Sequence, residues 1–340
     1  MNLLPSNREI LVFGRQRVII GSSERMEEIP DNSIDVIVTS PPYNVGKKYT
    51  PDGSFTDKLP MDEYLLFLKN VFRECLRVLK PDGLFFLNIG DSAKDQGKSE
   101  KVVNTAVHAG FKRVQTIIWV KSIFGMGHYT PSGGKRRFNN VWENVFLLSK
   151  TKNYRLDPKR IGIPYTDKSN IGRYSKEDLR DPGDVWFVPY EVTTGAKIKK
   201  GHEAPFPIGL PYLCIKSVPD AKTVLDPFAG TGSTLAASEY LGLEGIGYEL
   251  FPKKEVIRKR ILENSFKPPN TPLPRQLEKY VSIVDEILYN ALQFLSEEQK
   301  RRIMSKLSKK KKKTLTTSMK DLKHFPEWLE KMSQLLEDYY

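Results

Sequence analysis

A glycine-rich turn constrains the fold of this 340-residue chain more than any other segment. Residues 224–234 read Val-Leu-Asp-Pro-Phe-Ala-Gly-Thr-Gly-Ser-Thr, which predicts a buried strand, a tight turn and the start of a helix. Pro227 keeps the preceding Asp226 out of the helical region of backbone space. Gly230 and Gly232 carry no side chain, so the backbone there can approach a ligand closely. The segment therefore predicts a ligand-binding loop at the carboxyl end of a strand.

The residues after this turn predict a doubly wound sheet and the class of its ligand. Ser233 or Thr234 can cap a helix that begins at Leu235, and a second predicted strand, 244–249, ends in Glu249. An acid at the end of the second strand is where such folds hold the ribose hydroxyls of a nucleoside. The third glycine of the dinucleotide fingerprint is missing, as is the lysine of a P-loop. A nucleoside without a pyrophosphate fits better, and S-adenosylmethionine is the candidate cofactor.

A tetrapeptide far upstream, Ser40-Pro41-Pro42-Tyr43, carries the second signature. It follows the apolar run 34–39, which predicts a buried strand, so it lies on the loop just past a strand end. The Ser40 hydroxyl and the Pro41 carbonyl are hydrogen-bond acceptors, and the ring of Tyr43 is a stacking surface. Two such acceptors would push an exocyclic amine of a nucleobase towards tetrahedral geometry and free its lone pair for methylation. By itself, a Pro-Pro turn followed by an aromatic residue is also an ordinary strand exit.

Together the two motifs resemble those of the amino-group DNA methyltransferases of restriction–modification systems. The catalytic motif, 39–43, precedes the cofactor motif, 226–234, as in the circularly permuted beta group of that family. Three further segments are similar to the family in its order, namely 77–91, 141–150 and 202–207. Ordered co-occurrence of several modest motifs makes a chance match improbable.

The resemblance implies an α/β fold, namely a circularly permuted Rossmann-like S-adenosylmethionine-dependent methyltransferase fold with helices on both faces of a mostly parallel sheet. It also implies methyl transfer to the exocyclic N4 of cytosine in a short duplex site, since a serine that opens the tetrapeptide usually accompanies cytosine. Aspartate or asparagine accompanies adenine, so an N6-adenine DNA methyltransferase is the alternative. A non-catalytic nucleic-acid-binding protein is the more distant alternative. One departure is Gly21-Ser22, where relatives often carry Gly-Asp.

The expected site residues fall into three groups. Catalysis is assigned to Ser40, Pro41, Pro42 and Tyr43, with the flipped base stacked on Tyr43 near Phe228 or Trp119. Cofactor binding is assigned to Asp226, Phe228, Gly230, Gly232, Thr234, Glu249, Phe206 and Pro207. DNA contacts are expected from Lys135, Arg136, Arg137, Arg155, Lys159, Arg160 and Arg173. No metal site is predicted, because the four histidines and two cysteines lack ligand spacing.

The net charge of +13 predicts a polyanionic partner, and double-stranded DNA is the expected one. A lysine-rich solvated surface is the other explanation of this charge. Residues 135–137 follow a glycine-rich stretch and would form a basic loop beside the catalytic face. Residues 151–200 are polar and aromatic, and they occupy the place of the family's target recognition region. Their small number predicts a site of about four to six base pairs, read through base edges.

The expected domain organisation has three parts. Residues 1–265 form the catalytic domain, including the recognition region, 151–200. Residues 266–275 are a proline-rich linker, and 276–340 form a helical, basic C-terminal extension with apolar residues at helical spacing. The lysine run 309–313 in that extension either contacts phosphate or is a solvated loop.

The two cysteines, Cys75 and Cys214, lie in apolar helical contexts and are predicted to be buried structural thiols. Their small number fits a reducing cytoplasm. Neither follows a proline as in enzymes that attack carbon five of cytosine, so no covalent intermediate is expected. The chain contains no apolar run long enough to span a bilayer, and residues 1–5 lack a secretory signal. We expect a cytoplasmic monomer or homodimer with no membrane partner, and a cognate restriction endonuclease that acts separately.

Overall fold

The computed structural model describes residues 3–4, 7–46, 56–92, 95–121, 140–165, 168–173, 176–188 and 206–268. The chain divides into two compact units, Met1–Leu273 and Pro274–Tyr340, and every described residue lies in the first. The predicted C-terminal extension, 276–340, therefore lies outside the described residues. In the described part of the chain, no helix is both long and apolar enough to cross a membrane.

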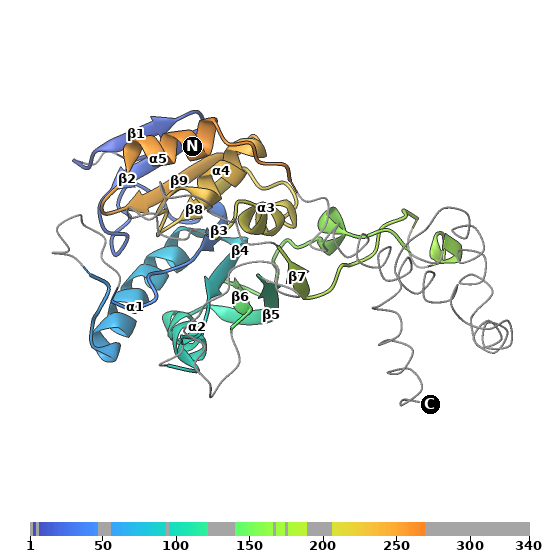
Figure 1. Ribbon diagram of the computed structural model, residues 1–340, viewed down its shortest axis with the longest axis horizontal. Coiled ribbons are helices and arrows are strands. Elements are labelled where there is room, and N and C mark those ends of the chain that lie inside the picture. Colours follow the sequence, from blue (N-terminus) through green and yellow to red (C-terminus); the bar gives the residue numbers. More distant parts are fainter. Residues whose placement is uncertain are drawn as a thin grey trace, which may run out of the picture. The chain divides into compact units, whose positions relative to one another are not determined.

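Within the described residues, nine strands form one sheet in the order β1-β2-β9-β8-β3-β4-β6-β5-β7 (Figure 1). The strands are β1 (Ile10–Phe13), β2 (Gln16–Ile20), β3 (Ile34–Thr39), β4 (Leu79–Ile89), β5 (Lys112–Val120), β6 (Trp142–Ser149), β7 (Val185–Phe187), β8 (Thr223–Asp226) and β9 (Glu244–Glu249). The five neighbouring strands β2, β9, β8, β3 and β4 are parallel to one another, and β7 is parallel to β5. Strand β6 is antiparallel to β4 and β5, and β1 is antiparallel to β2.

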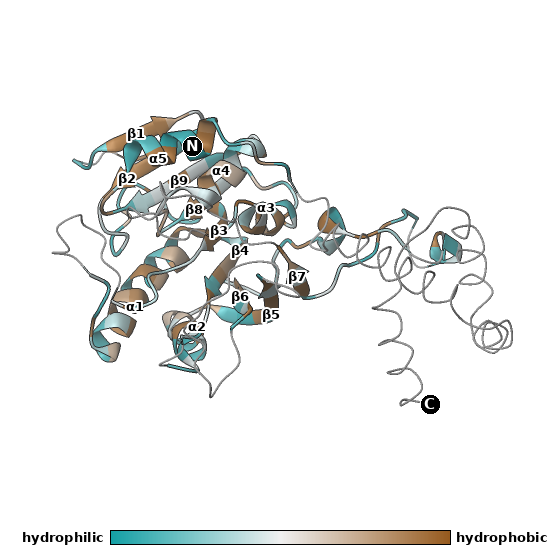
Figure 2. Ribbon diagram, in the orientation of Figure 1, coloured by the Kyte–Doolittle hydropathy of each residue, from teal (hydrophilic) through white to brown (hydrophobic). Residues whose placement is uncertain are grey.

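Helices cover both faces of this sheet, as the sequence predicts. The helices are α1 (Met61–Val78), α2 (Lys98–Ala109), α3 (Gly209–Lys216), α4 (Ser233–Tyr240) and α5 (Lys254–Leu262). Helices α1 and α2 pack with Ile37 on one face, whereas α3 and α4 pack with Val36 and Val38 on the other. Every residue of β3 is buried because both of its faces are covered. Figure 2 accordingly shows hydrophobic colouring on the central strands β3 and β4.

The sequence of α1 accounts for its length and position. Leu68, Phe72 and Cys75 recur at helical spacing and lie on the buried face of the helix. Asp62 and Glu63 lie in the first turn, where negative charge interacts favourably with the helix dipole and stabilises the helix. The predicted burial of both thiols is confirmed, because Cys75 on α1 and Cys214 on α3 are buried.

The start of α4 differs from the predicted start at Leu235 with a cap by Ser233 or Thr234. The helix begins at Ser233, and its N-cap is Gly232, which has a left-handed φ of 88° and no side chain to cap with. Ser233 Oγ instead donates to the Phe206 carbonyl at 2.8 Å, and Thr234 Oγ1 donates to the Val38 carbonyl at 3.3 Å. The two hydroxyls therefore connect α4 to neighbouring segments, which a local capping rule does not foresee.

Part of the segment expected to be a recognition region belongs to the sheet. Strand β7 lies within 151–200 and pairs with β5 through Ile118 and Val185, Trp119 and Trp186, and Val120 and Phe187. A three-residue strand is too short to show an alternating pattern in the sequence. The core sheet therefore extends into this segment.

Candidate active site

A pocket of about 640 Å³ opens at the carboxyl ends of the central strands and brings the two sequence motifs together. The tetrapeptide Ser40–Tyr43 lines one side, and the loop Pro227–Thr231 lines another. They meet because their strands are neighbours, with Ile37 of β3 beside Leu225 of β8. Other lining residues include Glu24, Asp57, Phe67, Asn88, Trp119, Glu143, Phe206, Glu249, Phe251 and Lys253.

A buried hydrogen bond connects the two loops. Thr39 Oγ1 donates to Asp226 Oδ1 at 2.5 Å, and the Phe228 amide donates to the same oxygen at 3.0 Å. Asp226 is 1% exposed and does not line the pocket. Burial raises the pKa of Asp226 to about 6, although hydrogen bonds from Thr39 and the Phe228 amide oppose the shift. In this structure Asp226 fixes the loop after β8 against the end of β3.

The raised pKa of Asp226 predicts a pH-dependent stability. A carboxyl whose pKa is higher in the folded than in the unfolded state stabilises fully below about pH 3.8, and this contribution is lost as pH rises through about 6. Asp226→Asn removes the titration and keeps an acceptor oxygen. Between pH 4 and 7 we expect wild type to lose about 2 kcal/mol of unfolding free energy relative to this variant. Urea unfolding at a series of pH values measures it, and parallel profiles would contradict the assignment.

The carbonyl groups of the tetrapeptide have different partners. The Pro42 carbonyl accepts from Tyr64 Oη at 2.6 Å, and the Tyr43 carbonyl accepts from Lys98 Nζ at 2.6 Å. Lys98 is buried, and this burial lowers the pKa of its ammonium. Within the described residues, the Pro41 carbonyl has no protein donor. The sequence assigned an acceptor role to this carbonyl, and Pro41 lines the pocket.

The hydroxyl groups of the tetrapeptide form a chain that ends on a carboxylate. Ser40 Oγ lies 3.2 Å from Tyr43 Oη, which donates to Glu143 Oε2 at 2.7 Å. Lys121 Nζ pairs with Glu143 Oε1 at 2.7 Å. Burial, together with the charge of Glu143, raises the pKa of the Tyr43 phenol well above its usual range, so the phenol stays protonated.

Sequence reasoning missed Glu143 as a site residue. It lies near the start of β6, inside the segment 141–150 that resembles a core strand of the family. The strand pattern itself holds the signal, because a charged residue within an otherwise apolar run must point to solvent, to a partner or into a site. The pairing partner that identifies its role, Tyr43, lies 100 residues away in the sequence.

The loop after β8 presents a cradle for a ligand. Gly230 has a left-handed φ of 54°, and a Cβ added there would meet only the Phe228 carbonyl, at 3.9 Å. The Gly230 amide donates to Glu249 Oε2 at 2.8 Å, and the Phe251 amide donates to Glu249 Oε1 at 3.1 Å. The buried hydroxyl oxygen of Thr231 has no hydrogen-bond partner in the described part of the chain. Open space beside an orphaned hydroxyl is what a bound polar ligand would occupy.

Not every predicted cofactor residue lies on this cradle. A Cβ on Gly232 would make ordinary contacts with Ile257 and Ile261 of α5, so its left-handed φ of 88° accounts for a glycine at this position. Gly232, Thr234 and Pro207 do not line the pocket, whereas Phe206, Phe228 and Glu249 do. The predicted aromatic neighbour Trp119 also lines it and is held by a 2.8 Å hydrogen bond from its indole to the Val188 carbonyl.

The pocket carries an excess of negative charge. Among its lining residues, Glu24, Asp57, Glu143 and Glu249 are acidic and Lys253 is basic. Negative walls attract cations and repel phosphates. The charge therefore fits a cationic ligand better than a dinucleotide, in agreement with the missing third glycine.

This chain has Ser22 where relatives often carry an aspartate, but the carboxylate of Glu24 lies beside it. Ser22 Oγ donates to Glu24 Oε2 at 3.2 Å, and both residues line the pocket. Asn70 Nδ2 donates to the other oxygen of Glu24 at 3.1 Å. An acid two residues after the expected position therefore contributes its charge to this wall.

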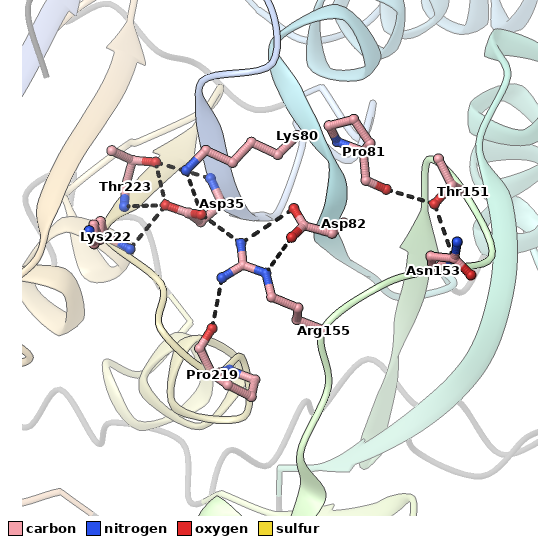
Figure 3. A network of polar contacts seen from close by, with 10 residues as sticks. All are labelled: Asp35, Lys80, Pro81, Asp82, Thr151, Asn153, Arg155, Pro219, Lys222 and Thr223. Carbon is pink, nitrogen blue, oxygen red and sulfur yellow. Dashed lines mark hydrogen bonds and ion pairs between the residues drawn. The ribbon is translucent and has the colours of Figure 1, made fainter.

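Arg155, predicted to contact DNA, lies in a polar network at the amino ends of the central strands, opposite the end at which the pocket opens (Figure 3). Its guanidinium donates to Asp35 Oδ1 at 2.7 Å and to the Pro219 carbonyl at 3.0 Å, and it pairs with Asp82 at 2.8 Å. Asp35 is at the start of β3, whereas Ser40 follows the end of that strand. The arrangement gives Arg155 a structural role at the amino ends of the strands.

Three further predicted DNA contacts among the described residues are not brought to the pocket. Lys159, Arg160 and Arg173 are exposed, and none of them lines the pocket. Arg160 donates to the Lys216 carbonyl at the end of α3, away from the pocket residue Phe206 before that helix. The predicted basic loop, Lys135, Arg136 and Arg137, lies outside the described residues.

Comparison with known proteins gives consistent matches. Residues 34–258 match the sequence profile of the DNA methylase family. The chain is 29% identical over 283 residues to the Type II methyltransferase M.BglII of Bacillus subtilis, covering 77% of this chain and 74% of the relative. It is 28% identical over 285 residues to the Type II methyltransferase M.SmaI of Serratia marcescens, covering 72% of this chain and 91% of the relative. The structure resembles PvuII DNA methyltransferase (cytosine-N4-specific) with a TM-score of 0.57 and 22% identity, covering 74% and 88% of the two chains. This likeness confirms the predicted fold class.

Proposed function

The chain belongs to the DNA methylase family, and we propose that it methylates the exocyclic N4 of cytosine in a short duplex site. The observation that carries this proposal is the pair of acceptors beside Tyr43 on the pocket-lining residues Pro41 and Ser40, namely a carbonyl that has no donor among the described residues and a hydroxyl oxygen. An exocyclic amine has two hydrogens to donate and a flat ring to stack, and this geometry matches both. Ser40 at the first position of the tetrapeptide favours cytosine over adenine.

The methyl donor is S-adenosylmethionine, which supplies an electrophilic methyl group on a positively charged sulfur. The negative charge of the pocket fits that cation, and the open face of Gly230 leaves room for it. Glu249 would hold the ribose hydroxyls, and the orphaned Thr231 hydroxyl offers a further polar partner. Phe206 and Phe228 would pack against the apolar parts. Asp226 would act through the loop that it holds in place.

The tetrapeptide activates the amine by position. With the base flipped out of the duplex and stacked on Tyr43, Ser40 Oγ and the Pro41 carbonyl each accept one amine hydrogen. Both bonds draw the nitrogen out of conjugation with the ring and direct its lone pair to the methyl group. Tyr64 and Lys98 fix the neighbouring carbonyls, so the Pro41 carbonyl is held in place before the base arrives. Such preorganised positioning contributes strongly to catalysis.

The basic chain would hold the duplex mainly through its phosphates, consistent with the net charge of +13. The exposed cations Lys159, Arg160 and Arg173 and the segment 135–137 are the proposed contacts. Methylation of a short site would protect host DNA from a cognate restriction endonuclease that acts as a separate protein.

Expression in a bacterial host without its own DNA methylation tests this function. We expect sequencing that detects modified bases to find N4-methylcytosine at one short motif throughout the genome, and no mark with a Ser40→Ala, Tyr43→Ala variant. N6-methyladenine at a motif would overturn the choice of base while leaving the DNA methylase family in place. An unmodified genome from a host that makes folded protein would contradict the proposal.

A further inference from the structure

The carboxylate of Glu143 is held in the pocket wall by groups from three different segments. Tyr43 Oη donates to Oε2 at 2.7 Å, Asn88 Nδ2 donates to the same oxygen at 3.2 Å, and Lys121 Nζ pairs with Oε1 at 2.7 Å. Its side chain is 14% exposed. A Cβ on Gly90 would come within 2.6 Å of Glu143 Cγ, so a glycine there makes room for this side chain. The acid is therefore built into the site.

The charge of Glu143 fixes the direction of the whole hydroxyl chain. An ionised carboxylate only accepts hydrogen bonds, so the single proton of Tyr43 Oη points at Glu143 Oε2, 2.7 Å away, rather than at the neutral Asn88 Oδ1, 3.5 Å away. Tyr43 Oη then acts as an acceptor, both for Ser40 Oγ, 3.2 Å away, and for the Gly90 amide. The single proton of Ser40 is thereby committed to Tyr43, and the free lone pairs of Ser40 Oγ are left for the pocket.

We infer that Glu143 is a positioning residue for methyl transfer, which acts through Tyr43 to keep Ser40 Oγ a hydrogen-bond acceptor for the target amine. Without this fixed direction, the Ser40 hydroxyl can point its proton at the amine nitrogen and occupy the lone pair that must attack. The inference rests on the proposed methylation of an exocyclic amine. It does not depend on whether the base is cytosine or adenine, because both amines present two hydrogens.

Glu143→Gln tests the inference with little change of shape. An amide can donate as well as accept, so the direction of the chain is no longer set. We expect kcat to fall about 10- to 100-fold, the range seen when a residue that orients a catalytic group is replaced. The KM for DNA and binding of the cofactor should stay within about threefold of wild type, because the surface of the pocket is kept.

A double-mutant cycle separates this role from a general structural one. If Glu143 acts through Ser40, Glu143→Gln should cost almost nothing further in a Ser40→Ala background, because contacting residues of one network are not additive. Tyr43→Phe provides a second variant in case Glu143→Gln folds poorly, since it breaks the same chain and predicts the same loss. Glu100→Gln is the matched control, because it removes an acid that is 52% exposed and paired with Arg113 outside the pocket.

A titration of Tyr43 gives a readout without cofactor or DNA. Ultraviolet titration, with Tyr43→Phe subtracted, should show the pKa of the Tyr43 phenol falling in Glu143→Gln, because the charge of Glu143 contributes to raising it. This result is independent of which base is methylated, so failure of the proposed function would be recognised separately. Wild-type kcat in Glu143→Gln, or an undiminished loss in the Ser40→Ala background, would overturn the inference.

Discussion

Replacement of Ser40 and Tyr43 by alanine in one chain is expected to reduce methyl transfer by about 10³- to 10⁵-fold. Removing a preorganised hydrogen-bonding group from a reacting centre costs about 10²- to 10³-fold. Removing an aromatic ring on which a base stacks costs a further 1–3 kcal/mol, or roughly 5- to 150-fold. Single-turnover transfer of labelled methyl groups to duplex DNA measures the combined loss.

Cofactor binding separates this effect from a folding defect. The loop at Gly230 is held by Glu249 and by the buried bond between Thr39 and Asp226, and the double variant leaves these contacts in place. Calorimetry should therefore show S-adenosylmethionine binding close to that of wild type. Tyr240→Ala is a suitable control, because Tyr240 is 53% exposed and does not line the pocket. Methylation that persists in the double variant would refute the catalytic assignment.

Loss of Asp35 should cause the largest change in stability. This carboxylate accepts from Lys80 and Arg155 through one oxygen and from the backbone and hydroxyl of Thr223 through the other. It joins the starts of β3, β4 and β8 and is 2% exposed (Figure 3). Asp35→Ala would leave two cations without their buried partner, and removal of one member of a buried pair costs about 3–5 kcal/mol of unfolding free energy. Urea unfolding at pH 7 measures this cost.

The matched control for this prediction is Asp82→Ala. Asp82 pairs with the same Arg155, but its side chain is 48% exposed, so removal should cost no more than about 1 kcal/mol. Burial tends to raise the pKa of Asp35, but hydrogen bonds from Lys80 and Arg155 outweigh it and lower the pKa to about 2. The resulting stability is present above pH 3.8 and is lost as pH falls towards 2. Equal costs for Asp35→Ala and Asp82→Ala at pH 7 would contradict this account.

Much of the fold follows from local sequence patterns. The predicted strand 34–39 coincides with β3, and the predicted strand 244–249 coincides with β9. Strand β3 is buried along its whole length and stands out as a mostly apolar run, whereas β9 was recognised from its place after the glycine-rich turn and its terminal acid. Strand β7 was not foreseen, because three residues carry no periodicity and their place is set by pairing with β5.

The site was predictable where it consists of motifs and unpredictable where it depends on long-range contacts. All four residues of the tetrapeptide line the pocket, as do Phe228, Gly230 and Glu249. The roles of Lys98 and Glu143 come from contacts with Tyr43, which lies 55 and 100 residues away in sequence. Arg155 illustrates the converse, because its place in the segment 151–200 suggested a contact with DNA, whereas its three-dimensional neighbours are the carboxylates in Figure 3.

Identification of the methylated base tests the account most directly. Purified protein would be incubated with mixed-sequence duplex DNA and S-adenosylmethionine carrying a labelled methyl group, and the DNA digested to nucleosides for mass analysis. We predict that the label appears as N4-methyl-deoxycytidine, and that it is absent with the Ser40→Ala, Tyr43→Ala variant. Label in N6-methyl-deoxyadenosine would contradict the role of Ser40 in choosing the base. No label in any nucleoside, from protein that binds S-adenosylmethionine, would contradict the proposed activity itself.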